Sequence, residues 1–159
     1  MGEEQSIEFM REAIRLSVDN VKSGKGGPFG AVVVKDGKII SRGANEVTSS
    51  NDPTAHAEVV AIRKACAALG TFQLSGCEIY CSCEPCPMCL GAIYWARPDK
   101  IYYASTKEDA AHVLFDDNFI YQELGRPIGE RKLFTKQMLR EEALEAFTRW
   151  KESASKKAY

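Results

Sequence analysis

The sequence lacks the features that define several other classes of protein. It has no run of 18 apolar residues, so we expect no membrane-spanning helix. It has no internal repeat or low-complexity tract, which argues against repeat architectures. Its first residues, Met1–Gln5, are polar and acidic and lack the basic and then apolar pattern of a secretory signal peptide. We therefore expect one domain over residues 1–159, located in the cytoplasm.

An excess of charge of either sign is also missing. The chain has 21 basic and 22 acidic side chains, for a net charge of −1. Binding to a phosphate backbone usually needs a basic stripe, so we expect no nucleic-acid partner. The charge balance favours a small, uncharged substrate.

Histidine is scarce, and cysteine is concentrated in one segment. The chain has two histidines and six cysteines, and Cys81, Cys83, Cys86 and Cys89 fall within nine residues. Without a secretory signal, such a cluster indicates a metal site in a reducing compartment rather than a disulfide framework.

Hydrophobic periodicity and turn signals predict alternating helices and strands. Ser6 is the expected N-cap of the first helix, and Asp36-Gly37 predicts a hairpin turn. The expected elements are a helix ending near residue 21, strands at 31–34 and 38–41, a helix at 55–69, a strand at 78–81, a helix at 88–96 and a strand at 101–104, with looser helices beyond 106. This alternation predicts an α/β fold with a central sheet and helices on both faces.

Two short motifs carry the chemistry: His56-Ala57-Glu58 and Pro85-Cys86-Pro87-Met88-Cys89. His-x-Glu followed by Pro-Cys-x-x-Cys is typical of zinc deaminases that act on nucleic-acid bases. Imidazole and thiolate ligands in a small site suit zinc. We expect both motifs at helix N-termini, where N–H groups and the helix dipole favour negative charge. The motifs predict one zinc ion per chain, held by His56, Cys86 and Cys89.

Glu58 has a separate predicted role as a catalytic proton carrier. Three protein ligands leave a fourth zinc position for water, and bound zinc lowers the pKa of that water toward ~7. A carboxylate that is not a ligand can then move a proton from water to a ring nitrogen and later to the departing ammonia.

A closed metal site stays open as the alternative. Cys83-x-x-Cys86 is a second pair with metal-ligand spacing, so His56, Cys83, Cys86 and Cys89 would make a four-ligand structural site. Such a site would belong to a non-catalytic zinc-binding interaction domain. The fourth ligand discriminates the two: water supports an enzyme and Cys83 supports the interaction domain.

Segments across nearly the whole chain resemble the short, zinc-dependent guanine deaminases of bacteria, in the cytidine-deaminase-like superfamily. These segments are Gly26–Ala31, Asn51–Glu58, Ser82–Cys89, Ala92–Arg97, Phe115–Asp117 and the terminal Tyr159. The resemblance implies a three-layer αβα sandwich with a central mixed sheet. It also implies a homodimer whose C-terminal segments exchange between the subunits.

The resemblance further implies a set of substrate contacts. Phe29 stacks on the base and Asn45 hydrogen-bonds to it; Asp117 and Tyr159 close the pocket, and Trp95 comes from the other subunit. Ala57 is a further implied contact, and Asp117 is a candidate catalytic residue beside Glu58. Simpler roles remain open: a turn residue for Asn45, core positions for Phe29 and Trp95, a helix cap for Asp116 or Asp117, and a frayed end for Tyr159.

The reaction expected from this resemblance is hydrolytic deamination of guanine to xanthine and ammonia. Asp117 would help to hold the ring N–H edge or relay a proton. Guanosine, cytosine and transfer-RNA adenosine are the alternative substrates. The near-neutral charge does not favour RNA, and a tail that closes the pocket does not favour a ribose.

Overall fold

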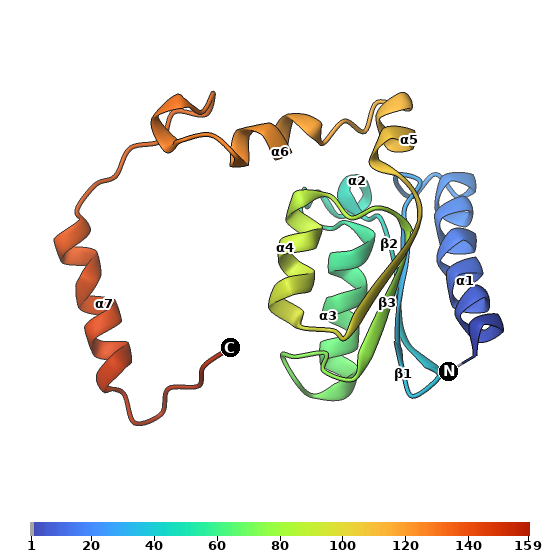
Figure 1. Cartoon of the computed structure of the whole chain (residues 1–159), viewed down its shortest axis with the longest axis horizontal. Coiled ribbons are helices and arrows are strands. Elements are labelled where there is room, and N and C mark those ends of the chain that lie inside the picture. Colours follow the sequence, from blue (N-terminus) through green and yellow to red (C-terminus); the bar gives the residue numbers. More distant parts are fainter. Residues whose placement is uncertain (1) are drawn as a thin grey trace. The chain divides into compact units, whose positions relative to one another are not determined.

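The computed structural model in Figure 1 describes residues 2–159. The chain divides into two compact units, the first ending at Asn118 and the second spanning Phe119–Tyr159. Every candidate site residue except Tyr159 belongs to unit 1. The expected organisation, one domain with a C-terminal segment exchanged between subunits, stays a prediction.

Unit 1 is built on a four-stranded mixed sheet in the order β2-β1-β3-β4. The strands are β1 (Gly30–Lys35), β2 (Lys38–Ala44), β3 (Cys77–Cys83) and β4 (Lys100–Ser105). β1 pairs antiparallel with β2 and β3, whereas β3 and β4 are parallel. The predicted hairpin is confirmed: Asp36 and Gly37, between β1 and β2, have φ values of 49° and 70°, as in a type I′ turn.

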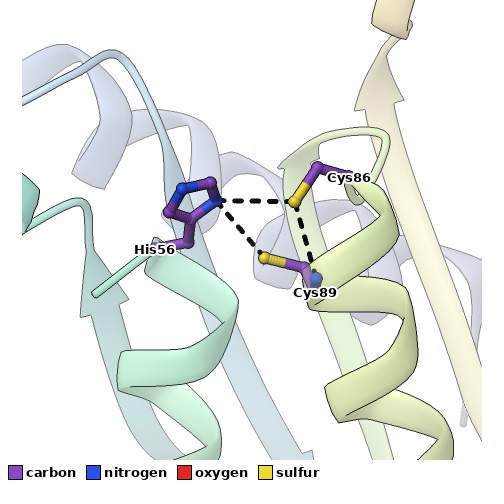
Figure 2. A group of neighbouring side chains, drawn as sticks. All are labelled: His56, Cys86 and Cys89. Carbon is purple, nitrogen blue, oxygen red and sulfur yellow. Dashed lines mark hydrogen bonds between the residues drawn. The ribbon is translucent and has the colours of Figure 1, made fainter. Parts of the chain in front are cut away.

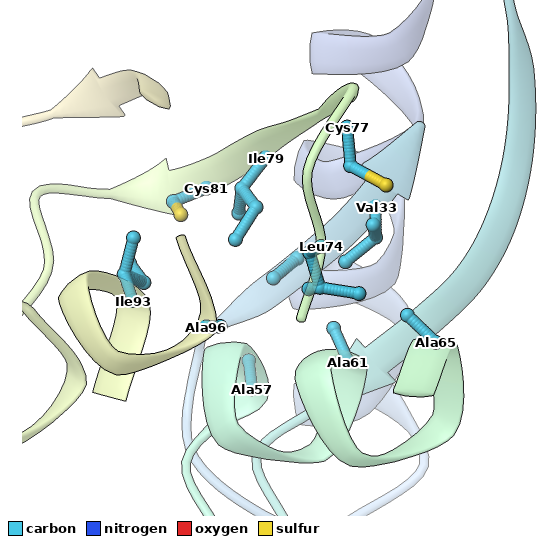
Figure 3. Packing of buried hydrophobic residues seen from close by; sticks show 11 residues of the cluster. Val33, Ala57, Ala61, Ala65, Leu74, Cys77, Ile79, Cys81, Ile93 and Ala96 are labelled. Carbon is cyan, nitrogen blue, oxygen red and sulfur yellow. The ribbon is translucent and has the colours of Figure 1, made fainter. Parts of the chain in front are cut away.

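Helices cover both faces of this sheet, which confirms the αβα sandwich (Figure 1). On one face lies α1 (Glu3–Lys22), whose Phe9 and Ala13 pack on Val32, Val34 and Tyr80. On the other face lie α3 (Ala57–Leu69) and α4 (Pro87–Ala96). Their buried side chains pack on the alternate residues of the same strands, as Figure 3 shows; the labelled cluster is Val33, Ala57, Ala61, Ala65, Leu74, Cys77, Ile79, Cys81, Ile93 and Ala96.

The boundaries of two helices differ from the sequence prediction. α1 begins at Glu3 after an N-cap at Gly2, so the prediction of Ser6 as the cap is wrong. Ser6 lies inside the helix, where its hydroxyl accepts a hydrogen bond from Tyr80 at 3.2 Å. A short helix that was not predicted, α2 (Val47–Ser50), follows β2. Beyond β4, unit 1 continues with α5 (Lys107–His112).

Unit 2 has helices but no core of its own. It contains most of α6 (Asn118–Leu124), the 3₁₀ helix η1 (Ile128–Glu130) and α7 (Arg140–Glu152). None of its side chains is buried, and large apolar residues such as Phe134 and Phe147 are 86% and 71% exposed. Among residues 2–159, no helix has both the length and the apolar character that crossing a bilayer requires.

The close approach of α3 to β2 depends on Gly43. A Cβ atom at this position would lie 2.1 Å from the Ala57 carbonyl oxygen and 2.7 Å from the Ala61 nitrogen. Two residues earlier, the Ser41 hydroxyl donates to the Ala61 carbonyl at 2.7 Å. The absence of a side chain at Gly43 therefore lets the first turn of α3, which follows His56, lie directly on the sheet.

We predict that Gly43→Ala displaces the start of α3 and destabilises the protein by about 1–3 kcal/mol, the usual range for an overpacked core. Urea unfolding would measure the change. Gly91→Ala is the matched control, because a Cβ at Gly91 in α4 meets no atom within 4 Å. The control should be as stable as the parent protein or more so; equal losses in both variants would contradict the role of Gly43.

Candidate functional site

The two sequence motifs meet at the starts of two neighbouring helices. His56 is the N-cap of α3 and Cys86 is the N-cap of α4, both with extended backbone conformation (Figure 2). Pro87 occupies the first helical position of α4, which its fixed φ suits. The Cys89 N–H donates to the Cys86 sulfur at 3.5 Å and so caps the helix. The prediction that both motifs lie at helix N-termini is confirmed.

The spacing of the three side chains fits a tetrahedral zinc ion. His56 Nδ1 lies 3.6 Å from Cys86 Sγ and 3.5 Å from Cys89 Sγ, and all three ligand atoms lie within 4.8 Å of one another. With Zn–N of about 2.0 Å and Zn–S of about 2.3 Å, a tetrahedral site separates nitrogen from sulfur by about 3.5 Å. Imidazole and thiolate donors also suit zinc chemically.

The electrostatics of the cluster favour the thiolate form of Cys86. Hydrogen bonds from the Cys89 thiol and from His56 lower the pKa of Cys86 to about 4. The proton stays on Cys89, because the contact with the Cys86 sulfur, together with burial, raises the pKa of Cys89. The hydrogen bond to Cys86 likewise raises the pKa of His56. A divalent cation displaces such protons when it binds, because its ligands must be deprotonated.

Glu58 lies beside the three donors in the first turn of α3. The residue is 7% exposed, and its carboxylate accepts a hydrogen bond from Cys89 Sγ at 3.4 Å. Burial raises the pKa of Glu58, and the charge of Cys86 adds to this effect. Because a proton carrier works best with a pKa close to the working pH, this shift suits Glu58 to acid–base chemistry.

Cys83 and Cys81 lie outside the group of candidate metal ligands. The thiol of Cys83, at the end of β3, donates to the Thr106 carbonyl at 3.5 Å. Cys81 is buried in the core between the sheet and α3. Within residues 2–159, the side chains brought together are therefore three and not four. This arrangement favours the open site over the closed alternative, in which Cys83 is the fourth ligand.

Phe29 and Asn45 lie on two loops joined to each other and to the metal motif. The Asn45 N–H donates to the Phe29 carbonyl at 3.1 Å. The next N–H, that of Glu46, donates at 2.9 Å to Ala55, the residue before His56. The Asn45 side chain also has a turn role, because its Oδ1 accepts from the Val47 N–H at 3.2 Å. That role uses the amide oxygen and not the amide nitrogen.

The three residues of the segment Phe115–Asp117 make different contacts. The ring of Phe115 meets that of Phe29 edge-on, with centroids 5.0 Å apart. Asp116 accepts from the N–H of Asn118, the first residue of α6, at 2.9 Å. Asp117 is half-buried, and its pKa is raised by burial and then by the charge of Cys86. The sequence did not predict a role for Phe115 at the site. Its position directly before Asp116 and Asp117, in a segment that carries the family resemblance, could have indicated one.

The remaining predicted contacts have different positions. Ala57 is fully buried as the first residue of α3. Trp95 is 64% exposed near the end of α4, whereas Cys86 and Cys89 lie at its start. Tyr159 ends unit 2 and is exposed within the chain. Within unit 1, backbone hydrogen bonds link the loops of Phe29 and Asn45 to each other and to the residue before His56, and Asp117 is close enough for the charge of Cys86 to affect its pKa.

Helix-start metal donors with a buried glutamate on an αβα sandwich occur in zinc-dependent deaminases of bases and nucleosides. Residues 3–105 match the family described as the cytidine and deoxycytidylate deaminase zinc-binding region, and the chain belongs to this family. The three-donor cluster accounts for one zinc ion per chain.

Known relatives extend the similarity beyond the family region. Guanine deaminase of Bacillus subtilis (strain 168) is 56% identical over 151 residues, which cover 95% of this chain and 97% of the relative. The X-ray structure of guanine deaminase from Bacillus subtilis superposes with a TM-score of 0.95 at 55% identity, covering 100% of this chain and 99% of that chain. The tRNA-specific adenosine deaminase of Aquifex aeolicus (strain VF5) is 42% identical over 105 residues, 66% of this chain and 67% of the relative.

We predict that Cys83→Ser keeps the metal and Cys86→Ser loses it, because only the second change removes a donor from the cluster. Elemental analysis of the purified variants would give zinc per chain. Wild-type protein should hold one zinc, Cys83→Ser the same amount, and Cys86→Ser much less. A metal-free Cys83→Ser variant that is still folded would instead establish the closed site.

Proposed function

We propose that this protein catalyses the hydrolytic deamination of guanine to xanthine and ammonia. The observation that carries the proposal is the 56% identity to guanine deaminase of Bacillus subtilis over 95% of the chain. A match of that extent includes most of unit 2, whereas the family region ends at residue 105. The relative that acts on transfer RNA matches 66% of this chain. The extended similarity and the lack of excess positive charge both favour guanine over RNA.

The reaction replaces the amino group on C2 of the base by oxygen from water and releases ammonia. We assign His56, Cys86 and Cys89 as the zinc ligands. Zinc held there supplies the Lewis acid that makes a water molecule nucleophilic near neutral pH. Glu58 would accept one proton from water and pass it to the ring nitrogen next to C2. It would then take the second proton from the oxygen now bound to C2 and pass it to the amino group, which leaves as ammonia.

Residues around the metal motif would hold the base. We assign Phe29 to stack on guanine, with its ring fixed by the edge-on contact with Phe115. The amide of Asn45 would hydrogen-bond to the base, and Asp117 would accept from its N–H edge. Ala57 would offer the backbone N–H of the first helical position, which α3 itself does not use.

We predict that Glu58→Gln binds zinc and guanine nearly normally but loses deamination by about 10²–10⁴-fold, the usual contribution of general acid–base catalysis. Glutamine keeps the size of the side chain but cannot carry the proton. Ammonia release from guanine and zinc content would be measured together. Glu108→Gln, which alters an exposed carboxylate in α5, should keep full activity. More than a tenth of the wild-type rate in Glu58→Gln would rule out the assignment of Glu58.

We also propose that the protein acts as a homodimer in which the C-terminal segments exchange, with Trp95 and Tyr159 as substrate contacts. The support is the apolar surface that one chain leaves exposed. Unit 2 buries no side chain, and Tyr94 and Trp95 of α4 are 74% and 64% exposed. A segment of this size has too little core to fold alone, so its apolar side chains need another surface.

We predict that deletion of Ala158-Tyr159 leaves the fold and the zinc content intact but raises KM for guanine or abolishes turnover. Loss of a phenol at the pocket would remove a base contact and admit water, which weakens the electrostatics of the site. The double change of Lys156 and Lys157 to alanine is the control, because it alters the tail but keeps Tyr159. Unchanged guanine kinetics after the deletion would show that the tail has no role at the site.

The proposed location is the cytoplasm. All six cysteines are free thiols in the described structure. Thiols at this density persist in reducing compartments, whereas secreted proteins of similar cysteine content usually form disulfides. A purine base in the metabolic pool would be available there.

A further inference from the structure

We propose that Asn20 is a positioning residue for the base, because it holds together the two loops that carry Phe29 and Asn45. The inference rests on the proposed function, in which these two residues touch guanine. Asn20 lies in the last turn of α1, on the face of the sheet opposite to α3 and α4. It is therefore a residue that would act through others and not by contact with the substrate.

The amide of Asn20 closes a ring of hydrogen bonds around these two loops. Its Nδ2 donates to the Gly27 carbonyl at 2.8 Å and to the Asn45 carbonyl at 2.9 Å. The Phe29 N–H donates to the same Gly27 carbonyl at 2.9 Å, and the Asn45 N–H donates to the Phe29 carbonyl at 3.1 Å. One side chain thus holds the backbone before Phe29 and the carbonyl of Asn45, and a backbone hydrogen bond joins the two loops directly.

Asparagine meets a specific chemical requirement at this position. The residue is 6% exposed, so its partners cannot be replaced by bulk water. An amide nitrogen carries two hydrogens, one for each carbonyl. Aspartate would instead place an acceptor against two carbonyl oxygens, and alanine would leave both without this donor.

The fit around the Asn45 carbonyl is close enough to exclude a side chain at Gly26. A Cβ at Gly26 would lie 2.1 Å from the Asn45 oxygen and 3.0 Å from the Asn20 Nδ2. The Asn45 carbonyl therefore occupies the space of the missing side chain. Only a backbone without Cβ lets the amide of Asn20 reach both loops at once.

The metal motif is held by hydrogen bonds of its own. A variant of Asn20 can therefore lose the base contacts and still keep the metal. The His56 N–H donates to the Thr54 carbonyl at 2.8 Å, and the Ala55 N–H donates to the Asp52 carbonyl at 3.0 Å. Neither bond involves Asn20. Loss of the Asn20 amide should therefore loosen Phe29 and Asn45 while His56, Cys86 and Cys89 keep their places.

The test is steady-state kinetics on guanine with full-length Asn20→Ala and Asn20→Asp, together with zinc content. Contacts with a bound base stabilise the ground state and the transition state equally. When these contacts are weakened, we expect KM to rise about tenfold or more while kcat stays within about twofold of the wild-type value. Zinc should stay at one per chain. Ser23→Ala is the matched control: it removes a 3.1 Å hydrogen bond to the Asn20 carbonyl in the same turn but leaves both loops untouched.

The split between KM and kcat distinguishes positioning from a merely structural role. A partly misfolded sample lowers apparent kcat and zinc content together but leaves KM unchanged, and that result would overturn the proposal. Unchanged KM with full zinc and normal kcat would overturn it as well. Absence of guanine turnover by the wild-type protein would overturn the proposed function and, with it, this inference.

A double-mutant cycle gives a second readout. If Asn20 acts partly through Asn45, the rise in KM for Asn20→Ala combined with Asn45→Ala should stay below the product of the two single rises. Rises that multiply fully would mean that Asn20 acts independently of Asn45, which contradicts the proposal.

Discussion

The candidate site depends on two helices that begin side by side at one end of the sheet. His56 and Cys86 are the N-caps of α3 and α4, and their ligand atoms lie 3.6 Å apart. The parallel crossover from β3 through α4 to β4 puts α4 on the same face as α3. Alanines 57, 61 and 65 and Gly43 keep α3 close to the strands. Bulkier residues there would move one set of donors away from the other, so packing in the core determines whether a metal site exists.

The same helix starts explain why the cluster can carry negative charge. The first N–H groups of a helix have no partner inside it, and the helix dipole favours anions at this end. Cys86 accepts a hydrogen bond from one of these N–H groups, because the N–H of Cys89, at the third helical position, points to its sulfur. A thiolate is therefore favoured before any cation is considered, and the pKa of Cys86 falls to about 4. The fold thus supplies Cys86 in the protonation state that zinc requires, whereas Cys89 would lose its proton when the ion binds.

Local signals in the sequence were sufficient for most elements and for the metal motif. Asp36-Gly37 and Gly70 mark a turn and a helix end because each needs a left-handed backbone, and the structure confirms both. The prediction of Ser6 as the cap is wrong because α1 begins earlier, at Glu3, and the Ser6 hydroxyl accepts from Tyr80, which is 74 residues away. Asn20 gave no signal for a similar reason: one of its partners is 25 residues distant, and nothing near Asn20 in the chain marks it. Residues that act through distant backbone groups are the ones that sequence patterns do not reveal.

The burial of Glu58 links the packing to the chemistry. An exposed glutamate has a pKa near 4.3 and is a poor proton donor at neutral pH. Glu58 is 7% exposed because it lies in the first turn of α3, and its carboxylate is close to Cys89. Burial and the charge of Cys86 therefore raise its pKa. A divalent cation held by the two sulfurs would neutralise part of the negative charge around Glu58. The pKa of Glu58 then reflects a balance between burial, which raises it, and the cation, which lowers it. A carboxyl held by these opposing effects can both accept a proton from water and return it to the leaving amine, which a fully solvated carboxylate does poorly.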